Sequence, residues 1–183
     1  MKLEILERDH FYHIYNRGIN SGNIFLSDEN KTYFLKLFSK YLMEKVEVYA
    51  YCLMDNHFHV VIKIVDDEKI VTQSLSNLFN AYAKAFNKQN DRTGSLFEKH
   101  FKRIKIQDEN YLRNIIQYVH LNPKHHLGLD YKTYKYSSFQ TIISDKQTKL
   151  ARNEVLSYFD GIDNFIYCHD FKNEILSEKL TFE

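Results

Sequence analysis

The chain has few of the residues that mark linkers, repeats or disulfide-bonded modules. It has 183 residues, with one proline, five glycines and two cysteines. So few chain-breaking residues argue against a linker, an internal repeat or a low-complexity tract. Cys52 and Cys168 are far apart and form no Cys-x-x-Cys pair, which argues against a disulfide framework and a thiolate zinc site.

Long apolar runs are also missing. No stretch of about 18 apolar residues occurs, so we expect no membrane span. The segment MKLEILERDH carries charges of both signs and lacks the apolar region of a secretory signal peptide, so the cytoplasm is the expected location. Apolar residues make up 44% and charged residues 27% of the chain. This composition and length fit a globular protein with one domain, or one domain plus a tail.

Hydrophobic periodicity predicts a mixed fold over the first 140 residues. Val, Ile and aromatic residues dominate four strand-like segments, and apolar residues recur at helical spacing in three others. The expected strands are 10–17, 46–54, 57–65 and 101–106, and the expected helices are 28–42, 71–86 and 108–123. Their order predicts an α+β fold, a ferredoxin-like sandwich in which helices cover one face of a central, mainly antiparallel sheet.

Turn residues and the C-terminal part complete this expectation. Asp55 and Asn56 separate two strands, and both residue types accept positive φ, which predicts a tight hairpin. Pro123 is expected to end the third helix because proline cannot continue one. Beyond about residue 140 the pattern weakens, and short helices are expected over 154–159 and 171–180.

The segment 55-DNHFHVVI-62 puts two histidines inside a predicted strand. Residues i and i+2 of a strand point to the same face, so His57 and His59 are neighbours while Phe58 points to the core. Two imidazoles about 7 Å apart along a strand can converge on one divalent cation. The same spacing fits two polar residues on the solvent side of an amphipathic strand. A metal site therefore needs a third ligand and a chemical partner.

The predicted helix 108–123 can supply both. Tyr118 lies roughly 120° from the centre of its apolar stripe, and Asn122 follows one turn later. Residues i and i+4 of a helix can approach the same point. Tyr118 also fits a half-buried packing role, and Asn122 fits the end of a helix. Tyr111, seven residues before Tyr118 on the same flank, is a second candidate nucleophile.

Positive charge is concentrated between residues 84 and 105. Seven basic and two acidic residues give this segment a net charge of +5, while the whole chain carries +1. Such asymmetry is typical of a phosphate-binding surface, and Phe97 and Phe101 lie among the cations, where they could stack on bases. A solvated helix face and loop would give the same pattern. The basic residues are Lys84, Lys88, Arg92, Lys99, Lys102, Arg103 and Lys105.

Six segments carry a resemblance to a known family. They are HIYNRG (13–18), NIF (23–25), YCLMDNHFHVVI (51–62), LSNLFNAYAKAFN (75–87), RTGSLFEKHFKRI (92–104) and YVHLNP (118–123). In this order they resemble the IS200-like Y1 transposases, in particular the REP-associated tyrosine transposases among the HUH single-strand nucleases. The resemblance covers about residues 10–140. It implies a Y1/HUH catalytic domain over 1–140 and a helical C-terminal extension over 141–183.

The resemblance also implies roles for individual residues. His57 and His59 would bind Mg²⁺ or Mn²⁺, Asn122 would be the third ligand, and Tyr118 would be the nucleophile. The partner would be single-stranded DNA next to a hairpin. Arg17 would contact its phosphate or a guanine, although a strand-end arginine in solvent is an alternative. Family members differ in oligomeric state, so a homodimer stays open.

We therefore expect a metal-dependent single-stranded DNA endonuclease and strand transferase that forms a 5′-phosphotyrosine. A phenol, with a pKa near about 10, is a poor nucleophile at neutral pH unless a nearby cation favours phenolate. Two alternatives remain, a non-catalytic single-stranded nucleic-acid-binding module and a hydrolase that activates water. The chain departs from many relatives at Asp55, which replaces a proline and is either a partner of the histidines or a turn residue. It departs again after Pro123, which leaves the DNA specificity open.

Overall fold

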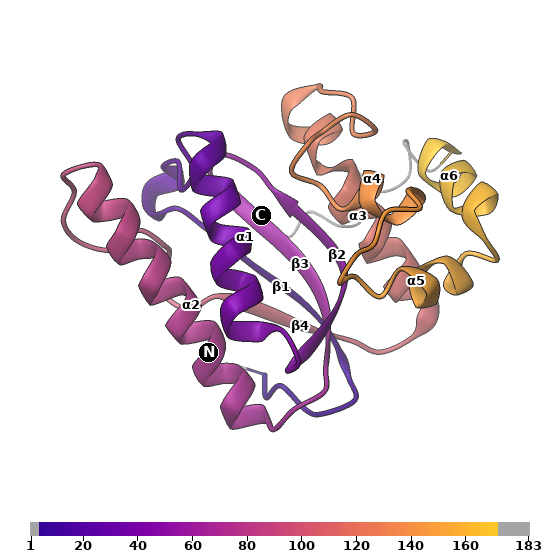
Figure 1. Cartoon of the computed structure of the whole chain (residues 1–183), viewed down its shortest axis with the longest axis horizontal. Helices are drawn as coiled ribbons and strands as arrows, with labels where there is room; N and C mark the ends of the chain where they lie inside the picture. The colour runs from indigo at the N-terminus through magenta and orange to yellow at the C-terminus, as the bar shows by residue number, and fades with distance from the viewer. Residues whose placement is uncertain (1–3, 172–183) are drawn as a thin grey trace.

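One antiparallel sheet organises the protein, whose computed structural model describes residues 4–171. Its strand order is β2-β3-β1-β4, so the two central strands are neighbours in space but not in sequence (Figure 1). All four predicted strands are present, with ends within one residue of those expected. They are β1 (Phe11–Arg17), β2 (Val46–Leu53), β3 (His57–Ile64) and β4 (Lys102–Ile106).

Helices cover both faces of this sheet, so the expectation of a single covered face is wrong. Alternate residues of β3 enter different cores: Phe58 and Val60 pack with α1 and α2, whereas Val61 packs with α3. Figure 1 shows α1 and α2 on one side and α3 to α6 on the other. The α+β class is confirmed. The helices are α1 (Asp28–Leu42), α2 (Glu68–Gln89), α3 (Glu109–Leu127), α4 (Phe139–Ile143), α5 (Arg152–Tyr158) and α6 (Ile162–Phe171), with a short 3-10 turn η1 (Ile19–Ser21).

The hairpin between β2 and β3 forms as predicted but with different backbone angles. Met54 N–H donates to the His57 carbonyl at 2.9 Å, which closes a two-residue turn over Asp55 and Asn56. Neither turn residue is among those with positive φ. The turn is held from outside instead, because Ile24 N–H and Phe25 N–H both donate to the Asp55 carbonyl.

Helix α3 begins where the sequence predicts and ends one turn later. The Asp108 side chain caps its first turn by accepting from Tyr111 N–H. Pro123 lies inside the helix, and the end comes at Gly128, which takes the left-handed conformation with φ 64°. The predicted end at Pro123 is therefore wrong. A proline removes one backbone donor, and burial of the preceding turn outweighs that loss here, since Leu121 and Asn122 have no exposed surface.

Helices α4 to α6 pack against α3 and share its core. Phe139, Val155 and Phe165 are buried in the same cluster as Val119 of α3. The short helix predicted over 154–159 corresponds to α5, whereas α6 was not predicted. The helix predicted over 171–180 lies outside the described residues, apart from its first position. Within residues 4–171, the structure contains no helix with the length and apolar character needed to cross a membrane.

Candidate active site

Strands β1 and β3 place four rings on the sheet face that α3 covers. Tyr15 lies opposite His59 in the register, and His13 lies opposite Val61. The His13 and His59 rings stack with centroids 5.0 Å apart, and Tyr15 stacks on His59 at 5.4 Å. His57 and His59 are 7% and 1% exposed. They share a face, as the strand period predicts, but this face is buried, so the solvent-side interpretation is wrong.

Helix α3 brings Tyr118 and Asn122 to these histidines. The Tyr118 ring meets the His59 ring edge-on, with centroids 5.5 Å apart. Asn122 Oδ1 lies 3.1 Å from His57 Nε2. The apolar stripe of α3 is buried on the sheet, and this packing turns the flank with Tyr118 and Asn122 toward β3. Thus the predicted convergence of strand and helix occurs within one chain.

Hydrogen bonds fix the side chains of His57 and Asn122. Asn122 Nδ2 donates to the Tyr118 carbonyl at 3.0 Å, which leaves Oδ1 facing His57. On the far side of the ring, His57 Nδ1 lies 2.7 Å from Asn56 Oδ1 and can donate to it. In that tautomer His57 Nε2 presents a lone pair to the Asn122 oxygen. Two facing acceptors at this distance suit a shared cation, and a histidine that ligates a metal usually donates its other N–H in this way.

His59 is held by a histidine whose role the sequence did not reveal. His13 Nε2 lies 2.9 Å from His59 Nδ1, and both side chains are buried. His59 Nε2 is also buried and has no hydrogen-bond partner among the described residues. Burial, followed by the neighbouring His13 and His57, holds the pKa of His59 well below its usual range. Burial lowers the pKa of His13 to about 3. Both rings are therefore neutral, the form that can ligate a metal.

The donor set at this centre fits a divalent cation. Among the described residues, no group of three or more His, Cys, Asp or Glu side chains is placed to hold a metal. The set would instead be the two Nε2 atoms of His57 and His59 and the Oδ1 atom of Asn122. The partnerless His59 Nε2 and the close approach of His57 Nε2 to Asn122 Oδ1 are the observations that favour this fit. Mixed nitrogen and carbonyl donors suit Mn²⁺ better than Mg²⁺, which prefers oxygen.

Three further residues bear on the centre. His126 lies 5.2 Å from His57 between ring centroids because α3 continues past Pro123. The Asp55 carboxylate accepts from Lys31 Nζ of α1 at 2.7 Å, so the structure pairs it with a lysine and not with the histidines. Tyr111 is half-buried, and burial raises the pKa of its phenol. Tyr111 stays the second candidate nucleophile.

A buried network on the far side of α3 fixes the rotation of this helix. His120 Nδ1 lies 2.9 Å from His169 Nε2, and His120 Nε2 lies 2.7 Å from Ser138 Oγ. His169 Nδ1 donates to the Phe165 carbonyl at 2.7 Å, and Tyr51 N–H donates to Ser138 Oγ. When both imidazoles are neutral, a single arrangement of their protons gives every donor and acceptor in this network a hydrogen-bond partner. The network ties α6 and β2 to the turn of α3 that carries Tyr118 and Asn122.

The predicted DNA-binding residues fall into two groups. Arg17 Nε pairs with Glu98 Oε1 at 2.6 Å, and Lys105 Nζ pairs with Glu7 Oε2 at 2.8 Å, so these two are neutralised. Arg92 lies over Phe86 and bonds to Asn87, and Arg103 bonds to the Glu4 carbonyl. The remaining four residues are exposed, and none of them forms a hydrogen bond or an ion pair with another described residue. These are Lys84, Lys88, Lys99 and Lys102.

Comparisons with known proteins bear on the family and the fold. The sequence matches the family model described as "Transposase IS200 like" over residues 8–122, which is more than half of the chain. A solved structure of a REP-associated tyrosine transposase bound to a REP hairpin aligns with a TM-score of 0.64 at 14% identity. The alignment covers 79% of this chain and 86% of that one, and at such identity it shows the fold alone.

Two further comparisons add nothing to the assignment. The tRNA(His) guanylyltransferase of Saccharomyces cerevisiae aligns over 87% of this chain and 80% of its own. Its TM-score is 0.43 at 8% identity, too low to support an argument. No curated protein is significantly similar in sequence.

Proposed function

The chain belongs to the IS200-like transposase family, and from that premise we propose that it is a metal-dependent single-stranded DNA endonuclease and strand transferase with Tyr118 as nucleophile. One observation carries the proposal. The Tyr118 ring lies 5.5 Å from that of His59, while Asn122 Oδ1 lies 3.1 Å from His57 Nε2. The proximity of a tyrosine, two histidines and an amide oxygen supports the arrangement that phosphodiester transesterification needs.

His57, His59 and Asn122 would hold the divalent cation, with Mn²⁺ preferred over Mg²⁺. When bound, such a cation withdraws charge from a phosphate and favours the phenolate of a neighbouring tyrosine. His13 and Asn56 set the tautomers of the two ligating imidazoles, and the Tyr118 carbonyl sets the orientation of the Asn122 amide. The ligands therefore enter the reaction already oriented, so little entropy is lost on binding.

The proposed reaction is a single exchange of phosphoester bonds. A bond forms between Tyr118 Oη and the scissile phosphorus as the bond from phosphorus to the 3′ oxygen breaks. The phenol loses its proton and the leaving oxygen gains one. The products are a 5′-phosphotyrosine and a free 3′-hydroxyl. Attack by a second 3′-hydroxyl reverses the exchange, so a strand is transferred without an external energy source.

Single-stranded DNA flanked by a hairpin is the proposed substrate. A protein with this fold has been solved bound to a REP hairpin, and four exposed lysines here lack an acidic partner in the described part of the chain. Cations of this kind bind phosphates with little regard to sequence. All four proposed catalytic side chains belong to one chain.

The test is incubation of the protein with hairpin-containing single-stranded DNA and Mn²⁺. Wild type should cut the strand and form a covalent adduct that survives denaturing electrophoresis. Tyr118→Phe should bind the same DNA but form no adduct and no cut product. Wild type in EDTA should behave like Tyr118→Phe.

Two other outcomes would point elsewhere. Tight binding that EDTA does not affect, with no cutting by wild type, would favour a non-catalytic binding module. Cutting retained by Tyr118→Phe would favour a hydrolase that activates water. Either result would overturn the assignment of Tyr118.

A further inference from the structure

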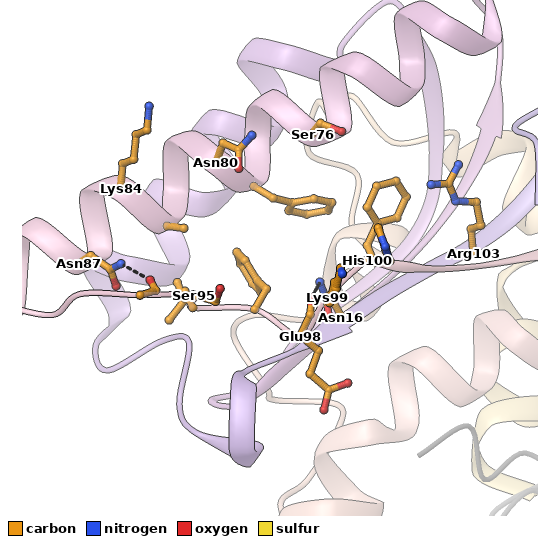
Figure 2. Close-up of a pocket in the computed structure, with 16 residues that line it drawn as sticks. Asn16, Ser76, Asn80, Lys84, Asn87, Ser95, Glu98, Lys99, His100 and Arg103 are labelled. Carbon is orange, nitrogen blue, oxygen red and sulfur yellow. Dashed lines mark hydrogen bonds between the residues drawn. The ribbon is translucent and has the colours of Figure 1, made fainter. Parts of the chain in front are cut away.

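A groove lies on the sheet face opposite the candidate active site. It has a volume of about 750 Å³ and runs between α2 and the segment 94–101 (Figure 2). This volume falls in the range of roughly 300–1,000 Å³ that is typical of ligand sites. We call it the α2 groove. Its lining includes Asn16, Phe79, Asn80, Lys84, Phe97 and Arg103.

The register of β1 separates the α2 groove from the catalytic face. Tyr15 points to the active site, where it stacks on His59. Asn16, the next residue, lines the groove, and its register partner is Phe58 of the first core. Successive strand residues point to opposite faces. A ligand in the groove therefore does not occupy the catalytic centre.

Aromatic rings form the apolar part of the groove. The Phe79 ring lies 5.6 Å from Phe97 and 5.2 Å from Phe101 between centroids. Phe97 is half-buried, so part of its ring is available to a ligand. Arg103 lies over the Phe101 ring at 4.4 Å. Aromatic rings and guanidinium planes are the surfaces on which unpaired bases stack.

Several polar groups of the groove are available to form hydrogen bonds with a ligand. Arg103 Nε is buried and has no hydrogen-bond partner among the described residues. Asn80 and Lys99 are exposed and make no hydrogen bond to another described residue. The acid of the lining, Glu98, pairs with Arg17 and points away from the groove in Figure 2. Carboxamides can read base edges and cations can bind phosphates.

The edge strand β4 connects the groove with the catalytic face. Lys102 pairs with Tyr15 in the register, so it points to the catalytic face, whereas Arg103 pairs with Ile14 and points to the groove. β4 is an edge strand of the sheet. A strand of DNA that crosses this edge would meet cations on both faces.

We propose that the α2 groove holds one unpaired nucleobase and its adjoining phosphate, from the single strand whose neighbouring segment enters the active site. The inference rests on the proposed function and adds a separate recognition site. The rings stack on the base, Asn80 contacts its edge, and Lys99 and Arg103 bind the phosphate. A paired base cannot enter, because its faces and edge are already engaged in the duplex.

Fluorescence anisotropy with labelled 12-mers in EDTA tests the groove. The probes are dA12, dC12, dT12 and an abasic deoxyribose-phosphate strand of the same length. Wild type should bind the tightest homopolymer about tenfold more strongly than the abasic strand, as stacking of a base requires. Asn80→Ala and Phe97→Leu should lose most of this difference and bind the abasic strand like wild type.

Asn77→Ala is the matched control, since Asn77 is exposed on the same helix one turn before Asn80 and does not line the groove. It should bind every probe like wild type. Asn80 is exposed, so Asn80→Ala should not reduce folding stability. It therefore tests the groove even if Phe97→Leu lowers the melting temperature. The inference is overturned if Asn80→Ala and Phe97→Leu keep the wild-type preference for bases. It is also overturned if these variants lose as much affinity for the abasic strand as for the homopolymers.

Failure of this inference differs from failure of the proposed function. Adduct formation with Mn²⁺ and saturating hairpin DNA reports only on Tyr118 and its neighbours. Wild type that forms the adduct but shows no preference for bases refutes the groove alone. Wild type that prefers bases but forms no adduct refutes the proposed function and leaves a base-binding groove.

Discussion

His57 Nε2 and Asn122 Oδ1 lie 3.1 Å apart although 65 residues separate them in the chain. The first atom comes from a strand of the sheet and the second from the helix that covers it. Both side chains are oriented by other groups, His57 by Asn56 and Asn122 by the Tyr118 carbonyl. This pair defines where a cation would sit relative to Tyr118.

Removal of the Asn122 oxygen should weaken cation binding. We expect Asn122→Leu to lower the affinity for Mn²⁺ by at least tenfold, since one of three donors is lost. Asn122→Asp keeps an oxygen and adds negative charge, so it should bind Mn²⁺ at least as tightly as wild type. Isothermal titration calorimetry with MnCl2 measures both, and Asn110→Ala, at the exposed start of α3, is the control. Equal affinities of wild type and Asn122→Leu would contradict a ligand role.

His13 should act on the cation through His59. We expect His13→Leu to lower Mn²⁺ affinity by roughly tenfold to 100-fold, the usual effect of removing a group that orients a ligand. His13→Gln should retain more affinity, because its amide can bond to His59 Nδ1. Melting temperatures without metal separate folding from binding, since His13 is fully buried. A merely structural role would give both variants the same affinity as wild type once they are folded.

The buried histidine pair between α3 and α6 should make stability depend on pH. Burial holds the pKa of His120 well below its usual range and that of His169 at about 4. The unfolded chain, with a histidine pKa near about 6.5, binds more protons than the folded one below that pH. The stabilisation is therefore complete above pH 6.5 and is lost as the pH falls toward the folded values. Each neutral imidazole should account for about 2 kcal/mol of lost stability by pH 5.

Urea unfolding between pH 7.5 and pH 5 measures this dependence. His169→Leu should lower stability at pH 7.5 and flatten the decline toward pH 5. Phe165→Leu, which changes packing against His169 without removing a titrating group, should lower stability equally at both pH values. A decline in His169→Leu as steep as that of wild type would show that other groups control the pH dependence.

Salt dependence should separate paired from unpaired lysines. Lys102 has no acidic partner in the described part of the chain, whereas Lys105 is paired with Glu7. For single strands, each phosphate contact adds about 0.7 to the slope of log K against log salt. Lys102→Ala should therefore reduce the magnitude of the slope of log K against log salt by roughly this amount. Lys105→Ala should change this slope little. Binding titrations from 50 to 400 mM NaCl measure both slopes. An equal change of slope in the two variants would contradict the division into paired and unpaired lysines.

Local patterns were sufficient to predict several parts of the site. The two-residue period put His57 and His59 on one face, and helical spacing put Tyr118 and Asn122 on one flank. The helix predicted from residue 108 begins there, where the Asp108 side chain caps its first turn. These features depend on neighbours within one turn or one strand, so the sequence contains them directly.

Other parts depend on which segments meet, which local patterns do not specify. The bond between His13 and His59 follows from the register of β1 against β3. The only local signal for this contact is the i, i+2 spacing of His13 and Tyr15, which puts both rings on one face of a strand. The burial of that face and the extension of α3 past Pro123 both follow from packing of α3 on the sheet. The same extension brings His126 beside His57.

Peptide mapping of the covalent adduct tests the central claim most directly. Trypsin cleaves after Lys105, Arg113 and Lys124, so Tyr111 and Tyr118 fall in different peptides, 106–113 and 114–124. After reaction with hairpin DNA and Mn²⁺, followed by nuclease digestion, we predict a nucleotide mass on the peptide 114–124 at Tyr118. A nucleotide on 106–113, or cut DNA with neither peptide modified, would contradict the account.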